Sequence, residues 1–150
     1  MPYDIERTFG FAVNRAAYVI RRAVEAAASS RGLGITPEEF AILALLWRKD
    51  GLRQGELAEL TLRDRTTLTR LVDGLVHKGL VRRRHDASDR RAIRTWLTAR
   101  GKRMEQTLAP MINELLKAGY DGIKRSELQG AIQTVSRVQD NYMEFVRRLE

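Results

Sequence analysis

Residues 53–101 decide the fold, and they read RQGELAELTLRDRTTLTRLVDGLVHKGLVRRRHDASDRRAIRTWLTARG. Residues 55–60 are a short helix-forming run, and residues 61–63 form a turn after it. Asp64 then has the residue type of an N-cap, whose carboxylate accepts a backbone N–H two or three residues later. The stretch therefore opens with two helices joined by a tight turn.

The second helix is predicted over residues 64–78. Its apolar residues recur at i, i+3, i+4, i+7 and i+8, as one stripe that must be buried: Leu68, Leu71, Val72, Leu75 and Val76. The opposite face carries Thr66, Thr69, Arg70, Asp73 and His77. Arg can read guanine through two hydrogen bonds, and Thr can reach base edges, methyl groups or phosphates. This face is predicted to enter a DNA major groove.

Gly79 ends the second helix, and two plausible strands follow, over residues 80–85 and 93–97. The loop between them, residues 86–91, has no large apolar side chain, so it should project into solvent as a wing. The outline is mainly α with a small β-hairpin wing, which is a winged helix-turn-helix. The alternative is a solvated hairpin with ordinary surface charge.

The wing loop combines acidic and basic residues. Asp86 and Asp89 are expected to hold the loop arginines, Arg90 and Arg91, in an extended pose. An Arg positioned in this way suits the narrow, negative minor groove of A·T-rich DNA.

Several motifs resemble the MarR family of bacterial transcription regulators. They lie at residues 55–58, 71–75 and 78–81, and above all in the wing residues 86–91 followed by Leu-Thr-Ala-Arg-Gly at 97–101. The last pair is specific to the family. One departure is Gly74, at a position where a larger and often charged residue is common; a glycine there lowers helix propensity.

The resemblance covers essentially the whole chain. It implies a reading helix over residues 64–78, a wing-tip arginine at Arg91, and Asp89 as the residue that orients Arg91. Together with the helix pattern, it gives these expected DNA-contacting residues: Arg63, Arg65, Thr66, Thr67, Thr69, Arg70, Arg90 and Arg91, with Asp89 in the orienting role.

The expected organisation is one domain over residues 1–150, in which a winged unit at 36–103 is flanked by dimerisation helices at 8–30 and 104–149. Thr8 to Ser29 has the spacing of an amphipathic helix. Near the C-terminus, seven apolar residues recur at steps of three and four: Leu128, Ile132, Val135, Val138, Tyr142, Phe145 and Leu149. Such a seam could be internal core, but its terminal position and the resemblance favour a homodimer interface.

Three helix starts are also predicted. Thr36 should cap a helix with Pro37 at its first position and Glu39 completing a capping box. Thr98 should cap a long helix that Pro110 kinks, and residues 126–129 read as a second capping box.

Composition is that of a globular domain, with 43% hydrophobic and 31% charged residues among 150. The net charge of +8 is unevenly placed: residues 63–103 hold 13 Lys or Arg and four Asp or Glu, a net of +9, and the remainder nets −1. The excess positive charge therefore lies on the proposed reading unit, as phosphate binding requires.

Targeting and redox features point to the cytoplasm. The chain has no Cys, begins without the basic and apolar regions of a signal peptide, and has no apolar run long enough to span a bilayer. No membrane association is expected.

An enzyme is not expected. His77 and His85 lie among Lys and Arg, which disfavours a bound cation, and no carboxylate or His cluster has metal-ligand spacing. Neither a phosphate-binding glycine loop after a strand nor a nucleophile elbow occurs, so no cofactor is implied.

Two functional classes compete. One is a dimeric, sequence-specific regulator of double-stranded DNA, a repressor at a pseudo-palindromic operator. The other is a nucleic-acid-binding or architectural protein without sequence preference. Trp96 is the only aromatic residue in the basic stretch, which argues against a single-strand stacking platform and favours a duplex reader.

The resemblance also implies a small-molecule effector, bound between the dimerisation helices and the reading unit. A small aromatic acid is the expected class. Arg15 is the candidate partner for its carboxylate and Trp47 the candidate ring contact; the alternatives are an ordinary surface Arg and a core Trp.

Overall fold

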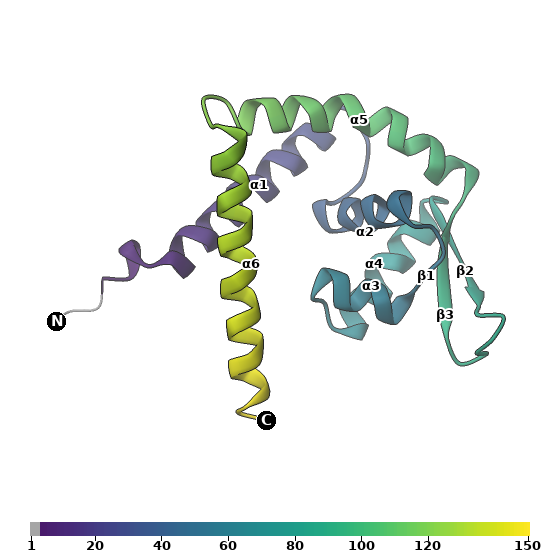
Figure 1. Cartoon of the computed structure of the whole chain (residues 1–150). Helices are drawn as coiled ribbons and strands as arrows, with labels where there is room; N and C mark the ends of the chain where they lie inside the picture. The colour runs from purple at the N-terminus through teal and green to yellow at the C-terminus, as the bar shows by residue number, and fades with distance from the viewer. Residues whose placement is uncertain (1–3) are drawn as a thin grey trace. The chain divides into compact units, whose positions relative to one another are not determined.

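The computed structural model describes residues 4–150, which fall into two compact units, one ending at Leu115 and one comprising Leu116–Glu150. The first unit contains η1 (Ile5–Arg7), α1 (Phe9–Ser29), α2 (Pro37–Arg48), β1 (Leu52–Arg53), α3 (Gln54–Thr61), α4 (Arg65–His77), β2 (Val81–His85), β3 (Ile93–Leu97) and most of α5 (Ala99–Gly119) (Figure 1). The second contains the end of α5 and α6 (Arg125–Arg147). The predicted mainly helical, winged fold is confirmed.

Helix starts follow the capping residues. Thr36 accepts the N–H of Glu39 at 3.2 Å, and the Glu39 carboxylate accepts the N–H of Thr36 at 2.9 Å, which is the predicted capping box. The Thr98 hydroxyl oxygen accepts the N–H of Gly101 at 3.0 Å in the first turn of α5. Thr8 likewise accepts from the N–H of Phe11 and begins α1.

The core of the first unit is built on α2. Ile42, Leu43 and Leu46 of α2 are fully buried. From α4, Leu68, Val72 and Leu75 pack into the same cluster, so the predicted apolar stripe faces inward. The end of this stripe is less buried, since Val76 is 39% exposed.

The sheet has three strands in the order β1-β3-β2, all antiparallel. β1 was not expected, because a two-residue strand leaves no periodic pattern in a sequence. It pairs Leu52 with Thr95 and Arg53 with Arg94, so the segment before α3 is tied to the wing. β2 is an edge strand with Arg82 opposite Trp96 and Arg84 opposite Arg94.

Gly101, the last residue of the Leu-Thr-Ala-Arg-Gly motif, lies where α5 leaves the sheet. A Cβ at this position would lie 2.0 Å from the Leu80 carbonyl oxygen. That oxygen accepts the N–H of Thr98 at 3.0 Å, and the Gly101 oxygen accepts the indole N–H of Trp47 at 3.0 Å. Only glycine allows this close contact between α5 and Leu80, the residue before β2.

Gly74 also has a packing role. A Cβ on Gly74 in α4 would lie 2.6 Å from a carboxylate oxygen of Glu39, which is 4% exposed. The same carboxylate forms an ion pair with Lys78 at 2.5 Å. The glycine that departs from the family pattern therefore makes room for an ion pair between the buried Glu39 of α2 and the half-buried Lys78 at the end of α4.

The second unit corrects one prediction. Lys124, and not Ser126, precedes α6, and the Glu127 carboxylate accepts its N–H at 2.9 Å. Glu127, three residues after Lys124, forms the reciprocal half of a capping box with Lys124 as the N-cap, so α6 begins before the predicted Ser126 motif.

Among residues 4–150, no helix has the length and apolar character that a membrane span requires.

Candidate nucleic-acid interface

The reading helix begins as predicted. Asp64 accepts both the N–H of Thr67 at 2.8 Å and its hydroxyl at 2.7 Å. The hydrogen bond from the Thr67 side chain is the main cause that lowers the pKa of Asp64. Thr67 is thus occupied in the cap, whereas Thr66 and Arg70 are exposed and engaged with no other side chain in the described part of the chain.

A groove of about 490 Å³ lies between the two helices of the reading unit and the wing. It brings together four of the predicted contact residues, which come from α4 and the loop before β3: Arg65, Thr69, Asp89 and Arg91. Glu56 and Glu59 of α3 also line it. The remaining predicted residues lie outside the groove lining: Arg63, Thr66, Thr67, Arg70 and Arg90.

Asp89 acts on the wing tip through the backbone. Its carboxylate accepts the N–H of Arg91 at 3.0 Å, and its carbonyl oxygen accepts the N–H of Ala92 at 3.0 Å. His85 contributes a further bond, from its Nδ1 to the Arg90 carbonyl oxygen at 2.9 Å. The loop is therefore closed by local hydrogen bonds, and the guanidinium of Arg91 remains exposed.

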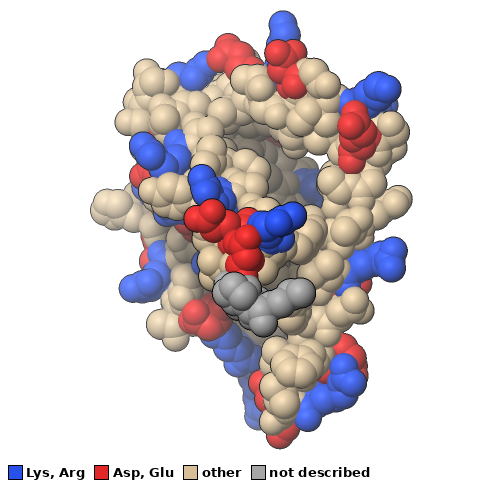
Figure 2. All heavy atoms as spheres, turned by 90° about the vertical axis from the view of Figure 1, so that its left-hand side faces the viewer, with Lys and Arg blue, Asp and Glu red and all other residues tan. Residues whose placement is uncertain are grey.

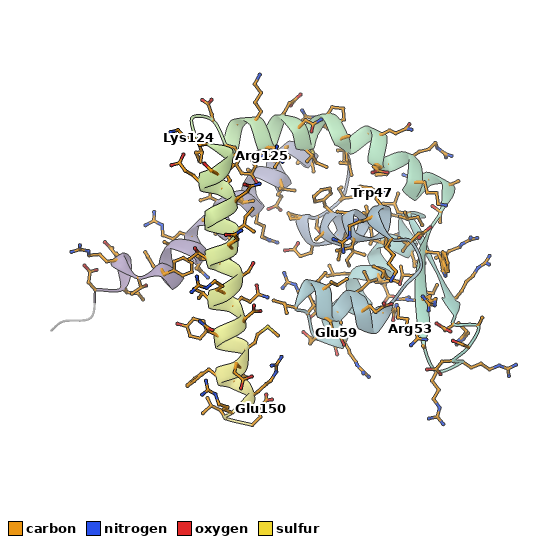
Figure 3. The ribbon with its side chains drawn as sticks, in the orientation of Figure 1. Trp47, Arg53, Glu59, Lys124, Arg125 and Glu150 are labelled. Atoms are coloured by element: carbon orange, nitrogen blue, oxygen red, sulfur yellow. The ribbon has the colours of Figure 1, made fainter. Side chains whose placement is uncertain are left out.

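Asp86 has a different role from the expected one. Its side chain is 3% exposed and binds Arg53 and Arg94 rather than the loop arginines. Its other oxygen accepts the Ser88 hydroxyl at 2.6 Å and the Ser88 N–H at 2.8 Å, and these bonds hold the pKa of Asp86 far below its usual range. Asp86 thus connects the base of the wing to Arg53, which Figure 3 shows where β1 meets α3.

Arg83 connects the wing to the reading helix. From β2 its guanidinium donates to the carbonyl oxygen of Thr69 at 3.1 Å and forms an ion pair with Asp73, both in α4. Sequence reasoning missed the positioning roles of Arg53, Arg83 and Arg94. No local pattern reveals them, because their partners lie on other elements.

Charge is segregated along the chain. The net of +9 in residues 63–103 lies on α4, the sheet and the start of α5. The face in Figure 2, by contrast, carries Lys and Arg interspersed with Asp and Glu and with wide areas of other residues. Among residues 4–150 no group of three or more His, Asp or Glu side chains could hold a metal ion.

The two candidate effector residues do not lie in one site. Trp47, which is labelled in Figure 3, lines a cleft of about 420 Å³ between α2 and α5, together with Phe40, Arg48 and Ile112. Its ring centroid is 6.1 Å from that of Phe40. Arg15 is absent from this lining; its guanidinium lies 5.7 Å from the ring centroid of Phe11 on α1.

Comparisons with known proteins show that this chain is similar to transcriptional regulators. The model of the MarR family matches residues 35–93. The chain is 26% identical to the transcriptional regulator HosA of Escherichia coli O157:H7 over 106 residues, which is 71% of this chain and 78% of HosA. It is 41% identical to the transcriptional repressor YetL of Bacillus subtilis over 80 residues, which is 51% of this chain and 48% of YetL.

A solved structure shows the same fold. BpsR of Bordetella bronchiseptica, a protein whose DNA binding is regulated by 6-hydroxynicotinic acid, superposes with a TM-score of 0.82. The match covers 93% of this chain and 99% of that one at 18% identity, so it concerns the fold alone.

Proposed function

We propose that this chain is a transcriptional regulator of the MarR type, as the family-model match over residues 35–93 supports, and that it acts by reading a specific sequence of double-stranded DNA. The main support is the groove in which Arg65 and Thr69 of α4 face Asp89 and Arg91 of the wing. When α4 and the wing lie side by side in this way, α4 can enter a major groove of DNA while the wing enters the adjacent minor groove. A bacterial regulator of this kind acts in the cytoplasm, where the DNA lies.

The residues would have distinct tasks. Arg70 and Thr66, exposed on α4, would contact base edges, while Arg63 and Arg90 would contact phosphates and Thr67 would hold the cap. Arg91 would enter the minor groove, with its backbone held by Asp89.

The decisive measurement compares a duplex selected from a random-sequence pool with random duplexes at one salt concentration. We expect an affinity ratio of roughly a thousand or more, as for specific regulators. A ratio near one would favour the alternative of an architectural protein. Arg70→Ala should reduce the free energy of discrimination that this ratio expresses by about 1–3 kcal/mol if Arg70 reads a base. Lys117→Gln, which removes one exposed charge from α5, is the matched control.

We further propose a homodimer that is formed through the terminal helices. The apolar seam of α6 is uncovered in the single chain: Ile132 is 65% exposed, Tyr142 67% and Phe145 52%. On α1, Ile20 is 62% exposed. Exposed apolar stripes of this extent are typical of association surfaces. A two-fold dimer would place two reading helices one DNA turn apart, about 34 Å, on a pseudo-palindromic operator.

Sedimentation tests the dimer. Deleting residues 139–150 removes part of the seam, so we expect a monomer at concentrations where the full chain is dimeric, together with weaker operator binding. A truncated chain that remains dimeric and binds the same operator equally well would refute this interface.

A repressor relieved by a small aromatic acid is the third proposal. The cleft beside Trp47 and Phe40 offers ring contacts, and Arg48 at its edge offers a carboxylate partner. Arg15 is tested beside Arg48, because sequence reasoning favours it. A ligand that binds the folded form raises Tm. A thermal-shift screen of aromatic acids on wild type, Arg48→Gln and Arg15→Gln should identify a ligand whose shift one variant loses, and that ligand should weaken operator binding.

A further inference from the structure

The outer face of the wing sheet, away from the core, carries a second basic depression. It has a volume of about 460 Å³ and is lined by β2, the wing loop and β3, with Arg82, Arg84, Asp86, Arg94 and Trp96 among its residues. None of these strand residues lies on the reading helix. The depression is separate from the groove that contains Arg65 and Thr69.

Strand register explains why the arginines gather there. Side chains alternate across a strand, so Arg82 and Arg84 share one face while Arg83 points to the other. The partners opposite them on β3 are Trp96 and Arg94. Val81, Thr95 and Leu97 are buried on the inner face.

The inner and outer arginines differ in their partners. Arg83 is used within the fold, since it binds Asp73 and the Thr69 carbonyl oxygen of α4. Arg82 and Arg84 form no ion pair with any acidic residue in the range 4–150 and are exposed. Two free guanidinium groups on one strand face are therefore available to an anion.

The nearest acidic group cannot neutralise them. Asp86 lines the depression, but it is 4% exposed and already bound to Arg53, Arg94 and Ser88. Arg84 also lies directly opposite Arg94, and like charges at such a pair destabilise a sheet. Arg94 is paired with Asp86 and donates to the Gly51 carbonyl oxygen, so Arg84 is the member of this cross-strand pair that no acidic residue in the range 4–150 compensates.

We infer that this outer sheet face, through Arg82 and Arg84, binds the phosphate backbone of DNA that flanks the operator. Arg82 and Arg84 lie about 7 Å apart along the strand, from the rise of two residues, so they can contact separate phosphates. The face is continuous with the wing loop, which extends past the ends of β2 and β3 (Figure 1). The inference rests on the proposed function, and it extends the contact surface beyond the reading helix and wing tip.

A charged edge strand has another known benefit, because charge deters pairing with a second sheet. Either positive or negative charge on the edge strand gives that benefit. Phosphate binding needs positive charge, so substitutions that keep or reverse the sign separate the two explanations.

The test measures affinity for duplexes that share one selected core and differ in flank length, at several salt concentrations. Wild type should bind more tightly as the flanks lengthen. The double variant Arg82→Gln/Arg84→Gln should lose this gain on long duplexes and match wild type on the shortest one. Its salt slope on long duplexes should be lower by about two, so that between 50 and 200 mM salt its affinity falls roughly tenfold less.

Matched variants complete the design. Arg82→Lys/Arg84→Lys should keep most of the flank effect, and Arg82→Glu/Arg84→Glu should lose more than the Gln pair. Arg7→Gln/Lys117→Gln, which removes two exposed charges outside residues 63–103, is the control. An unchanged salt slope in the Gln pair, or an equal loss in the control, would overturn the inference.

The failure of the proposed function has a different signature. If the chain discriminates no sequence, the same variants are measured on random duplexes of increasing length, since phosphate contacts do not depend on sequence. A flank-length effect that depends on Arg82 and Arg84 would then support the surface even though the specific regulator is refuted.

Discussion

Gly101→Ala tests the close contact between α5 and Leu80, the residue before β2. The new Cβ would lie 2.0 Å from the Leu80 carbonyl oxygen, 3.0 Å from its carbon and 3.2 Å from a methyl carbon of Leu97. The oxygen is backbone and is held by the Thr98 N–H, so it cannot rotate away as a flexible side chain could. The chain must shift by more than an ångström at the start of α5.

The energy can be worked out from three contributions. Overpacking of a tight contact costs about 1–3 kcal/mol. Weakening the hydrogen bond from Thr98 to Leu80 costs about 1 kcal/mol. Ala is better than Gly inside a helix by about 1 kcal/mol, which opposes the first two. The net expectation is a loss of about 2 kcal/mol, and a Tm that is lower by roughly 4–8 °C for a chain of this size.

Thermal and denaturant unfolding at one protein concentration measure this loss. Gly130→Ala is the matched control, because Gly130 lies inside α6 and a Cβ there meets nothing within 4 Å. The control should gain up to about 1 kcal/mol from helix propensity. If Gly101→Ala were as stable as Gly130→Ala, the steric explanation of this glycine would be wrong.

Three other predictions concern single side chains. Gly74→Ala should destabilise the fold less than Gly101→Ala, as measured by Tm, because the atom it meets ends a flexible carboxylate side chain. The hydrogen bonds from Ser88 are the main cause that lowers the pKa of Asp86. The ionised carboxylate therefore stabilises the fold above the ordinary pKa of 3.8, and this stabilisation is lost as the pH falls below that value. Asp86→Asn should lower the free energy of unfolding at pH 7 and flatten this acid dependence in urea titrations. Asp89→Ala should loosen operator binding at fixed salt although the net charge rises, because Asp89 holds the backbone of Arg91; tighter binding would refute the orienting role.

Much of the fold follows from local chemistry in the sequence. The caps at Thr36, Asp64 and Thr98 begin helices where capping residues predict them, because the first N–H groups of a helix need acceptors nearby in the chain. The inward face of α4 follows from apolar spacing, since one stripe must be buried. The family motifs pointed to the same winged unit.

Other features depend on contacts between distant residues. Asp86 was expected to restrain loop arginines, yet the register of β1 on β3 brings Arg53 and Arg94 to it instead. Leu62 adopts a φ of 51° at the end of α3, which its residue type does not signal.

The sequence by itself determined where helices begin, which faces are apolar and where the positive charge lies, because each depends on residues close together in the chain. Only the tertiary structure decided which arginines are used within the fold and which are free. Arg82, Arg83 and Arg84 are identical letters in the sequence, but strand alternation and the packing of α4 against β2 give Arg83 partners and leave its neighbours exposed. The partners of a side chain lie on other elements that pack beside it, and the neighbouring residues in the sequence do not indicate which elements these are.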